Sequence, residues 1–177
     1  MPILRQIALL GHPVLRGVAG KVIDPADPAV QALIDDMLVT ALDANGVGIA
    51  APQVFEPLSL FIVASRPNQR YPNAPEMEPT AMINPEILWE SDEKEKGWEG
   101  CLSIPGLRGL VSRHRRIGVR YLTRKGEIRE VEYADFLARV FQHEFDHVQG
   151  MLFVDRVEST RELMIEKEYL RSLQSHA

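Results

Sequence analysis

The sequence predicts an α+β protein in which antiparallel β-sheets pack around a central helix, with a further helix toward each end of the chain. One amphipathic helical pattern precedes a block of strands and two follow it, so the elements do not alternate as in a parallel βαβ chain. A length of 177 residues suits a single domain, residues 1–177. Hydrophobic residues make up 45% and charged residues 25%, which is typical of a globular protein.

The first helix is predicted over Pro28–Asp43. Asp27 is a good N-cap before a proline at the first helical position, and apolar residues then recur at helical spacing. An Asn-Gly pair at 45–46 predicts its end, and GVGIAAPQV follows. The two glycines of this stretch let the backbone approach a neighbour or ligand closely, so we expect a loop or an irregular strand.

The middle of the chain is predicted to be mostly β. Leu58–Ala64 reads as a buried strand, residues 65–79 contain four prolines and should form a surface loop, and Thr80–Glu90 resumes as a strand. Residues 116–133 alternate apolar and polar side chains on both sides of an Arg-Lys-Gly turn, which predicts a hairpin.

Two helices are predicted in the last third of the chain. Residues 135–148 carry apolar side chains at helical spacing, and the four residues 159–162 (STRE) resemble a capping box that opens a last helix. A net charge of −5 argues against general nucleic-acid binding, DNA included. The N-terminal stretch lacks a continuous apolar core, so we expect neither a signal peptide nor a membrane span, and the cytoplasm is the expected location.

The helix predicted over 135–148 contains an H-E-x-x-H pattern. His143 and His147 would lie one turn apart on the same face, so both imidazoles can reach one metal ion, and Glu144 would lie beside the ion as a general base. Such a pattern also arises by chance on exposed helices, but the apolar neighbours here favour a buried site. Phe136 and Val140 share the histidine face and would either line an apolar pocket or simply pack in the core.

A catalytic site of this type needs a third protein ligand. In zinc endopeptidases of the thermolysin type this ligand is a glutamate on a later helix, and Glu166 and Glu168 lie near the required distance. The alternative is Cys101, the one cysteine of the chain, which cannot form an internal disulfide and lies in EGCLSIPG. A lone cysteine is usually an inert small hydrophobe, but the histidine pair makes a ligand role more plausible.

Three motifs together resemble the peptide deformylase family: GVGIAAPQ (46–53), EGCLS (99–103) and QHEFDH (142–147), in that order. The resemblance covers most of residues 3–157 and favours Cys101 as the third ligand, which leaves the two glutamates as solvated charges. It implies a metal-dependent hydrolase that removes the formyl group from the N-terminal formylmethionine of newly made polypeptides. The expected ion is Fe²⁺, with Zn²⁺, Ni²⁺ or Co²⁺ as alternatives.

The resemblance also assigns residues. It implies that Cys101, His143 and His147 bind the metal, that Glu144 is the general acid/base, and that the Gln53 side chain and the Leu102 N–H stabilise the oxyanion. Substrate-binding positions would be Val47, Gly48, Ile49, Glu99, Phe136 and Val140, with Val47, Phe136 and Val140 around the methionine side chain. Arg108 is a candidate ion-pair partner of Glu99. The expected partners are N-formylmethionyl nascent peptides, and docking of a monomer on the ribosome near its exit tunnel is a hypothesis.

Overall fold

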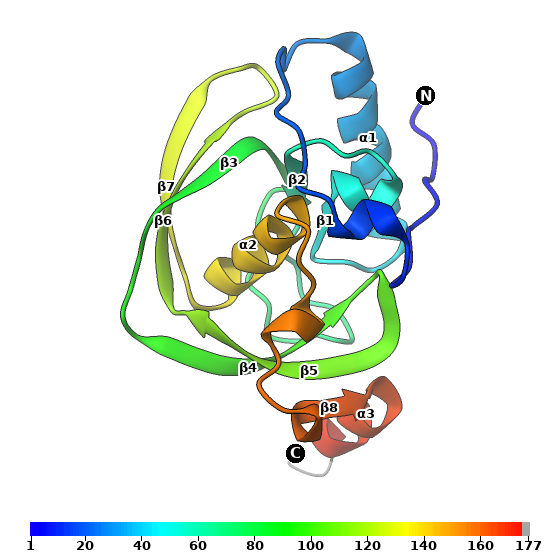
Figure 1. Ribbon diagram of the computed structural model, residues 1–177, viewed down its shortest axis with the longest axis vertical. Coiled ribbons are helices and arrows are strands. Elements are labelled where there is room, and N and C mark those ends of the chain that lie inside the picture. The colour runs from blue at the N-terminus through cyan, green and yellow to red at the C-terminus, as the bar shows by residue number, and fades with distance from the viewer. Residues whose placement is uncertain (175–177) are drawn as a thin grey trace.

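The computed structural model describes residues 1–174 and confirms the α+β prediction. Its larger antiparallel sheet has the order β1 (Gly48–Ala50), β2 (Leu60–Val63), β3 (Thr80–Glu90), β6 (Arg116–Leu122) and β7 (Ile128–Ala134). The smaller sheet contains β4 (Lys94–Cys101), β5 (Ile104–His114) and β8 (Leu163–Ile165). Figure 1 shows α2 (Asp135–Val148) in the centre, α1 (Pro28–Asp43) to one side and α3 (Glu166–Gln174) beyond β5.

Helix α1 has the predicted bounds. The Asp27 side chain accepts a hydrogen bond from the Ala29 N–H, which satisfies one free donor of the first turn. Its buried face packs against β1 and β2, and each large apolar side chain removed from water there contributes roughly 1.5–3 kcal/mol. After the helix, Asn45 takes a φ of 52°, a conformation that asparagine tolerates well, and the chain turns into β1.

The Asp36 carboxylate and the Thr40 hydroxyl of α1 both bind the N-terminal stretch. Asp36 accepts hydrogen bonds from the Ile3 N–H and from Arg5 Nε, both at 2.8 Å. Burial alone would raise the pKa of Asp36, but these two donors lower it below its ordinary value of 3.8. Asp36 is therefore ionised near neutral pH and stabilises the packing of the first residues on the helix.

Helix α2 is buried on several sides, because both sheets surround it. Phe141 packs edge-to-face on Phe61 of β2, with ring centroids 5.1 Å apart. The polar side chains of this helix are buried as well, and buried polar groups need hydrogen-bond partners or a ligand. The buried polar residues of α2 are Gln142, Glu144, Asp146 and His147.

The prediction that residues 159–162 open the last helix is wrong. Ser159 does cap a short turn, where its side chain accepts a hydrogen bond from the Arg161 N–H, but that turn is a 3-10 helix over Thr160–Glu162. Strand β8 follows and pairs with β5, so α3 begins only at Glu166. Pairing with a neighbouring strand thus overrides the local capping signal, since strand hydrogen bonds satisfy the same backbone groups.

Residues 65–79 form no helix or strand, as their prolines predicted. This segment, which we call the β2–β3 loop, nevertheless packs on the rest of the molecule. The Ser65 hydroxyl donates to the Pro75 carbonyl at 2.6 Å, and Ala74 is buried. Within residues 1–174, none of the helices has the length and apolar character needed to cross a membrane.

Candidate metal centre and active site

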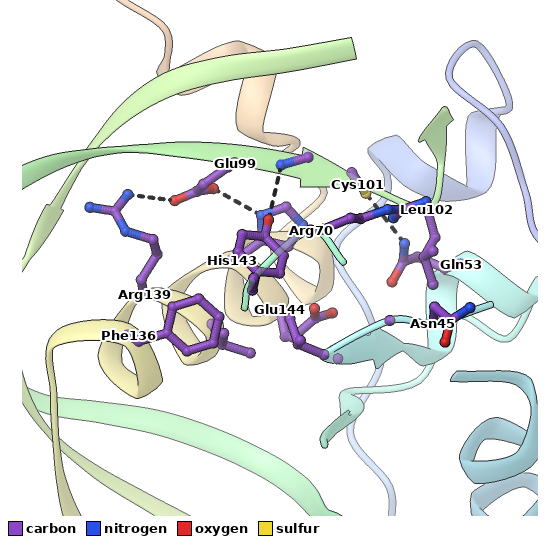
Figure 2. Close-up of a pocket in the computed structure, with 16 residues that line it drawn as sticks. Asn45, Gln53, Arg70, Glu99, Cys101, Leu102, Phe136, Arg139, His143 and Glu144 are labelled. Atoms are coloured by element: carbon purple, nitrogen blue, oxygen red, sulfur yellow. Dashed lines mark hydrogen bonds and ion pairs between the residues drawn. The ribbon is translucent and has the colours of Figure 1, made fainter. Parts of the chain in front are cut away.

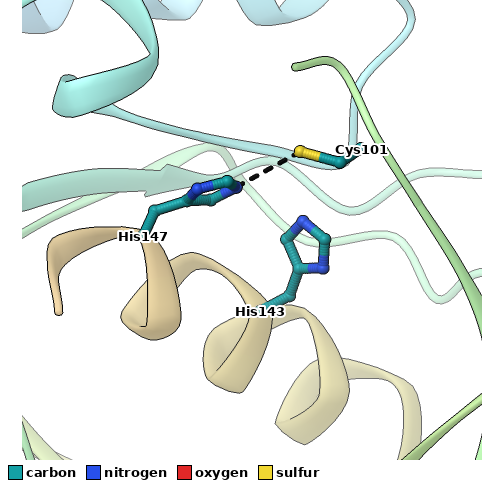
Figure 3. Close-up of side chains that lie close together, drawn as sticks. All are labelled: Cys101, His143 and His147. Carbon is teal, nitrogen blue, oxygen red and sulfur yellow. Dashed lines mark hydrogen bonds between the residues drawn. The ribbon is translucent and has the colours of Figure 1, made fainter. Parts of the chain in front are cut away.

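The structure brings Cys101, His143 and His147 together. One potential ligand atom from each lies within 4.8 Å of the others, and the Cys101 Sγ is 3.3 Å from the His147 Nε2 (Figure 3). Cys101 ends β4, and the histidines lie one turn apart on α2. Glu166 and Glu168, the alternative third ligands, lie on α3 and are not members of this group.

The chemistry of these donors suits a divalent metal ion. A thiolate and two imidazoles form a three-ligand set that leaves a fourth tetrahedral position for a reactant. Burial lowers the pKa of His147 well below its ordinary value, so its ring is neutral, which is the form that binds metal. In the part of the chain that the structure describes, the buried Glu144 Oε2 atom has no hydrogen-bond partner, as expected beside a site that takes a ligand.

Glu99 fixes the orientation of His143. Its Oε2 lies 2.9 Å from the His143 Nδ1, which leaves the Nε2 of that ring for a metal ion. Arg113 binds Glu99 with two hydrogen bonds of 2.9 and 3.0 Å, and Arg139 adds one of 3.0 Å. Burial opposes ionisation of Glu99, but Arg113 and His143 outweigh it and hold its pKa far below the usual range. The carboxylate is therefore charged and is held by several bonds.

The expected pairing of Arg108 with Glu99 is wrong, and the strand register explains why. Arg108 lies opposite Gly100, whereas Glu99 lies opposite Gly109. Directly opposed residues point to the same face of a sheet, so Arg108 and Glu99 point to opposite faces. Arg113 has the correct alternation for the Glu99 face, and its Nη1 also donates to Asp146 at 2.6 Å.

Glu144 lies beside the ligand group and faces β1. Burial raises the pKa of this carboxyl to about 7, partly opposed by the neighbouring His143. Its closest neighbour on β1 is Gly48, where an added Cβ would lie 2.5 Å from the Glu144 Oε1. A residue with no side chain at position 48 is therefore what allows the carboxylate to occupy this place.

Gln53 presents its amide N–H groups to the cysteine. Its Oε1 accepts a hydrogen bond from the Ala50 N–H at 2.8 Å, which fixes the side-chain orientation. The Nε2 then lies 3.1 Å from the Ser103 Oγ and 3.4 Å from the Cys101 Sγ. Leu102, partly buried, follows the cysteine and lines the same cavity.

These groups border a cavity of about 540 Å³, a volume that includes part of the open solvent at its mouth. Figure 2 shows side chains that line it. Val47, Gly48, Glu99, Phe136 and Val140, which the resemblance implies as substrate-binding positions, line this cavity. Ile49 is fully buried, packs in the core beside α1 and is not among the residues that line the cavity. Outside the three motifs, the sequence did not indicate four further lining residues, Asn45, Arg70, Tyr71 and Arg139.

Comparison with known proteins agrees with this geometry. A family model described as polypeptide deformylase matches residues 4–162. The chain belongs to this family. Its members are metal-dependent hydrolases that remove the N-terminal formyl group from nascent polypeptides, so the family match disfavours the endopeptidase alternative.

Individual relatives match nearly the whole chain. Peptide deformylase 2 from Nostoc sp. is 57% identical, over 95% of this chain and 94% of the relative. Among solved structures, the Met-Ala-Ser-bound class I type b peptide deformylase from Acinetobacter baumannii is 46% identical with a TM-score of 0.86, over 89% of this chain and all of that one. The peptide deformylase from Thermotoga maritima is 39% identical with a TM-score of 0.79, over 88% of this chain and 99% of that one.

Proposed function

We propose that this chain hydrolyses the formyl-amide bond of N-terminal formylmethionine on newly made polypeptides and releases formate. The observation that carries this proposal is the grouping of Cys101, His143 and His147. Cys101, His143 and Glu144 line a cavity that the apolar side chains of Val47, Phe136 and Val140 also line. A relative of 46% identity was solved with Met-Ala-Ser bound, which is the peptide that deformylation of formyl-Met-Ala-Ser would leave.

Cys101, His143 and His147 would hold one divalent ion. When bound, such an ion supplies Lewis acidity that polarises the formyl oxygen and lowers the pKa of water. We propose Fe²⁺ in the cell, and the thiolate and imidazole donors also suit Zn²⁺, Ni²⁺ or Co²⁺. Glu99 has a positioning role here, because its bond to the His143 Nδ1 selects the ring nitrogen that faces the ion.

Glu144 would carry the proton of the reaction. Its carboxylate takes a proton from the attacking water and delivers it to the amine nitrogen as the C–N bond breaks, which turns a poor leaving group into a neutral amine. The buried position of Glu144 supports this role, because a dry site keeps the proton on its path.

The formyl oxygen gains negative charge as the carbon becomes tetrahedral, and it needs donors at that moment. We assign this task to the Gln53 Nε2 and to the backbone N–H of Leu102. The Gln53 amide is held by its bond to Ala50 and faces the cysteine, so it requires little reorganisation. Such preorganised donors are typically worth about 3–4 kcal/mol each in acyl transfer.

The substrate side chain would enter the apolar part of the cavity, between Val47, Phe136 and Val140. The peptide backbone would pair with Gly48 and Ile49. Strand β1 supports this arrangement, because it is outermost in its sheet and pairs with β2 along one edge. Backbone pairing reads little sequence, so we expect broad tolerance of residues after methionine.

Turnover of formyl-Met-Ala-Ser tests the proposal. The iron-loaded chain should release formate under anaerobic conditions, should leave casein intact and should lose turnover in Glu144→Gln while retaining its metal. Digestion of casein would indicate an endopeptidase, and absence of formate release from the loaded wild-type chain would indicate a non-catalytic relative. A cytoplasmic location, a monomeric state and docking on the ribosome stay predictions, which fractionation, sedimentation and ribosome pelleting can test.

A further inference from the structure

Arg108 is the largest fully buried side chain of the described residues, with 1% of its surface exposed. Its Nη1 donates to the Tyr71 hydroxyl and its Nη2 donates to the Glu166 Oε1, each at 2.9 Å. The guanidinium also lies over the Tyr71 and Tyr169 rings, at 5.2 and 5.0 Å from their centroids. A buried cation is stable only with such partners, so these contacts are structurally required. The expectation that Glu166 is merely a solvated charge is therefore wrong.

The partners of Arg108 come from two distant segments. Tyr71 belongs to the β2–β3 loop, and Glu166 begins α3. Arg70 of the same loop also reaches Glu166, with Nε 3.2 Å from the same Oε1. The Glu166 Oε1 thus binds the β2–β3 loop in two ways, directly through Arg70 and indirectly through Arg108, which binds Tyr71.

Tyr71 connects the cavity with the Arg108 cluster, by which we mean Arg108, Arg70, Tyr71, Glu166 and Tyr169. Its ring packs against the Phe136 ring at a centroid distance of 5.2 Å, and its hydroxyl lies 3.4 Å from the Gly100 N–H, which donates to it. Arg70, Tyr71, Gly100 and Phe136 all line the cavity, whereas Glu166 does not. Figure 2 shows Arg70 and Phe136 among the lining side chains.

The two ends of the cluster differ in how they are held. Strand β8 pairs with β5 at Arg108 and Met164, and Tyr169 packs against Trp98 at 5.9 Å, so α3 begins from an anchored strand. The β2–β3 loop has no helix or strand of its own. Its position therefore depends strongly on side-chain contacts such as those of Tyr71.

We propose that Glu166, Arg108 and Tyr71 are positioning residues that hold the β2–β3 loop as the outer wall of the cavity, so that the C-terminal helix sets the affinity for the substrate. This inference rests on the proposed function. An intact wall stabilises the bound substrate and the transition state to the same extent, so its loss raises KM and leaves kcat nearly unchanged.

Tyr71→Phe and Glu166→Gln, alone and combined, test the proposal against Glu168→Gln. Both glutamates lie on α3, but Glu168 pairs with Arg171 at the surface. With formyl-Met-Ala-Ser, each of the first two changes should raise KM about threefold to tenfold, the equivalent of one hydrogen bond. The double variant should fall short of the product of the two effects, because Tyr71 and Glu166 share Arg108 as a hydrogen-bond partner. Glu168→Gln should leave KM and kcat unchanged.

Trypsin provides a second measurement that does not depend on activity. Within the β2–β3 loop, Arg66 precedes a proline, so Arg70–Tyr71 is the cleavable bond. Cleavage there should be faster in Glu166→Gln than in Glu168→Gln, with other sites unaffected. The proposal would be overturned if Glu166→Gln had the KM and the trypsin cleavage rate of the wild type. It would also be overturned if Glu168→Gln changed both quantities as much as Glu166→Gln does. If wild-type chain releases no formate, the proposed function fails, whereas cleavage still reports on the loop.

Discussion

Replacing Gly48 with alanine should disable the site without unfolding the protein. The new Cβ would lie 2.5 Å from the Glu144 Oε1, 2.8 Å from its Cδ and 2.9 Å from its Cγ. These separations are roughly 1 Å shorter than the distance at which nonbonded carbon atoms attract. Glu144 is 4% exposed and belongs to the tightly packed helix α2. Its carboxylate therefore has to move while its backbone stays in place.

A displacement of about 1 Å at a proton-transfer group can reduce the rate about a hundredfold. We therefore expect kcat for formyl-Met-Ala-Ser to fall about a hundredfold in Gly48→Ala. Metal content, measured by elemental analysis, should stay at the wild-type level because the three proposed ligands, Cys101, His143 and His147, are unchanged. The matched control is Gly20→Ala, where an added Cβ meets the Pro57 carbonyl oxygen at an ordinary 3.6 Å. A wild-type kcat in Gly48→Ala, or an equal loss in Gly20→Ala, would refute the reasoning.

Three further outcomes are expected. Cys101→Ser should lose metal during dialysis, whereas retention of wild-type metal content would count against a sulfur ligand. Arg113→Ala should lower the free energy of unfolding, measured in urea, by about 3–5 kcal/mol, because the buried Glu99 and Asp146 carboxylates both lose this partner. Replacing the exposed Arg116 with alanine should lower it by less than about 1 kcal/mol, and equal losses in the two variants would contradict the reasoning. Because the folded-state pKa of Asp36 is lowered, its stabilisation is complete above the ordinary value of 3.8 and is lost as the pH falls through the lower folded-state value. The Tm difference between wild type and Asp36→Asn should thus shrink below about pH 4, and a constant difference would contradict this.

Helices α1 and α2 and the placement of His143 and His147 on one helix were predictable because their signals are local. Asp27 with a following proline fixed the start of α1, and the spacing of His143 and His147 placed both rings on one face. The family resemblance then favoured Cys101, which periodicity alone could not select. The helix start and the histidine spacing depend on neighbours a few positions apart, which a single sequence displays directly.

The remaining features depend on contacts between distant segments. Strands β4 and β5 were not assigned individually, so the face on which each arginine lies was unknown and Glu99 received the wrong partner. The predicted start of α3 was wrong for a similar reason, because β8 forms only where β5 is available to pair with it. The role of Tyr71 was hidden as well, since its contacts with Phe136 and Arg108 link residues far apart in the chain.

The ligand group also has a consequence for the topology of the chain. Cys101 and His147 are 46 positions apart, and β5, β6 and β7 lie between them. An ion held by both would act as a cross-link that closes this stretch into a ring and restricts the unfolded chain more than the folded one. Binding of an ion to these side chains would therefore shift the folding equilibrium toward the native state, since an ion that binds only the native state stabilises it by mass action. Cys101, His143 and His147 would thus contribute both to catalysis and to the stability of the folded chain.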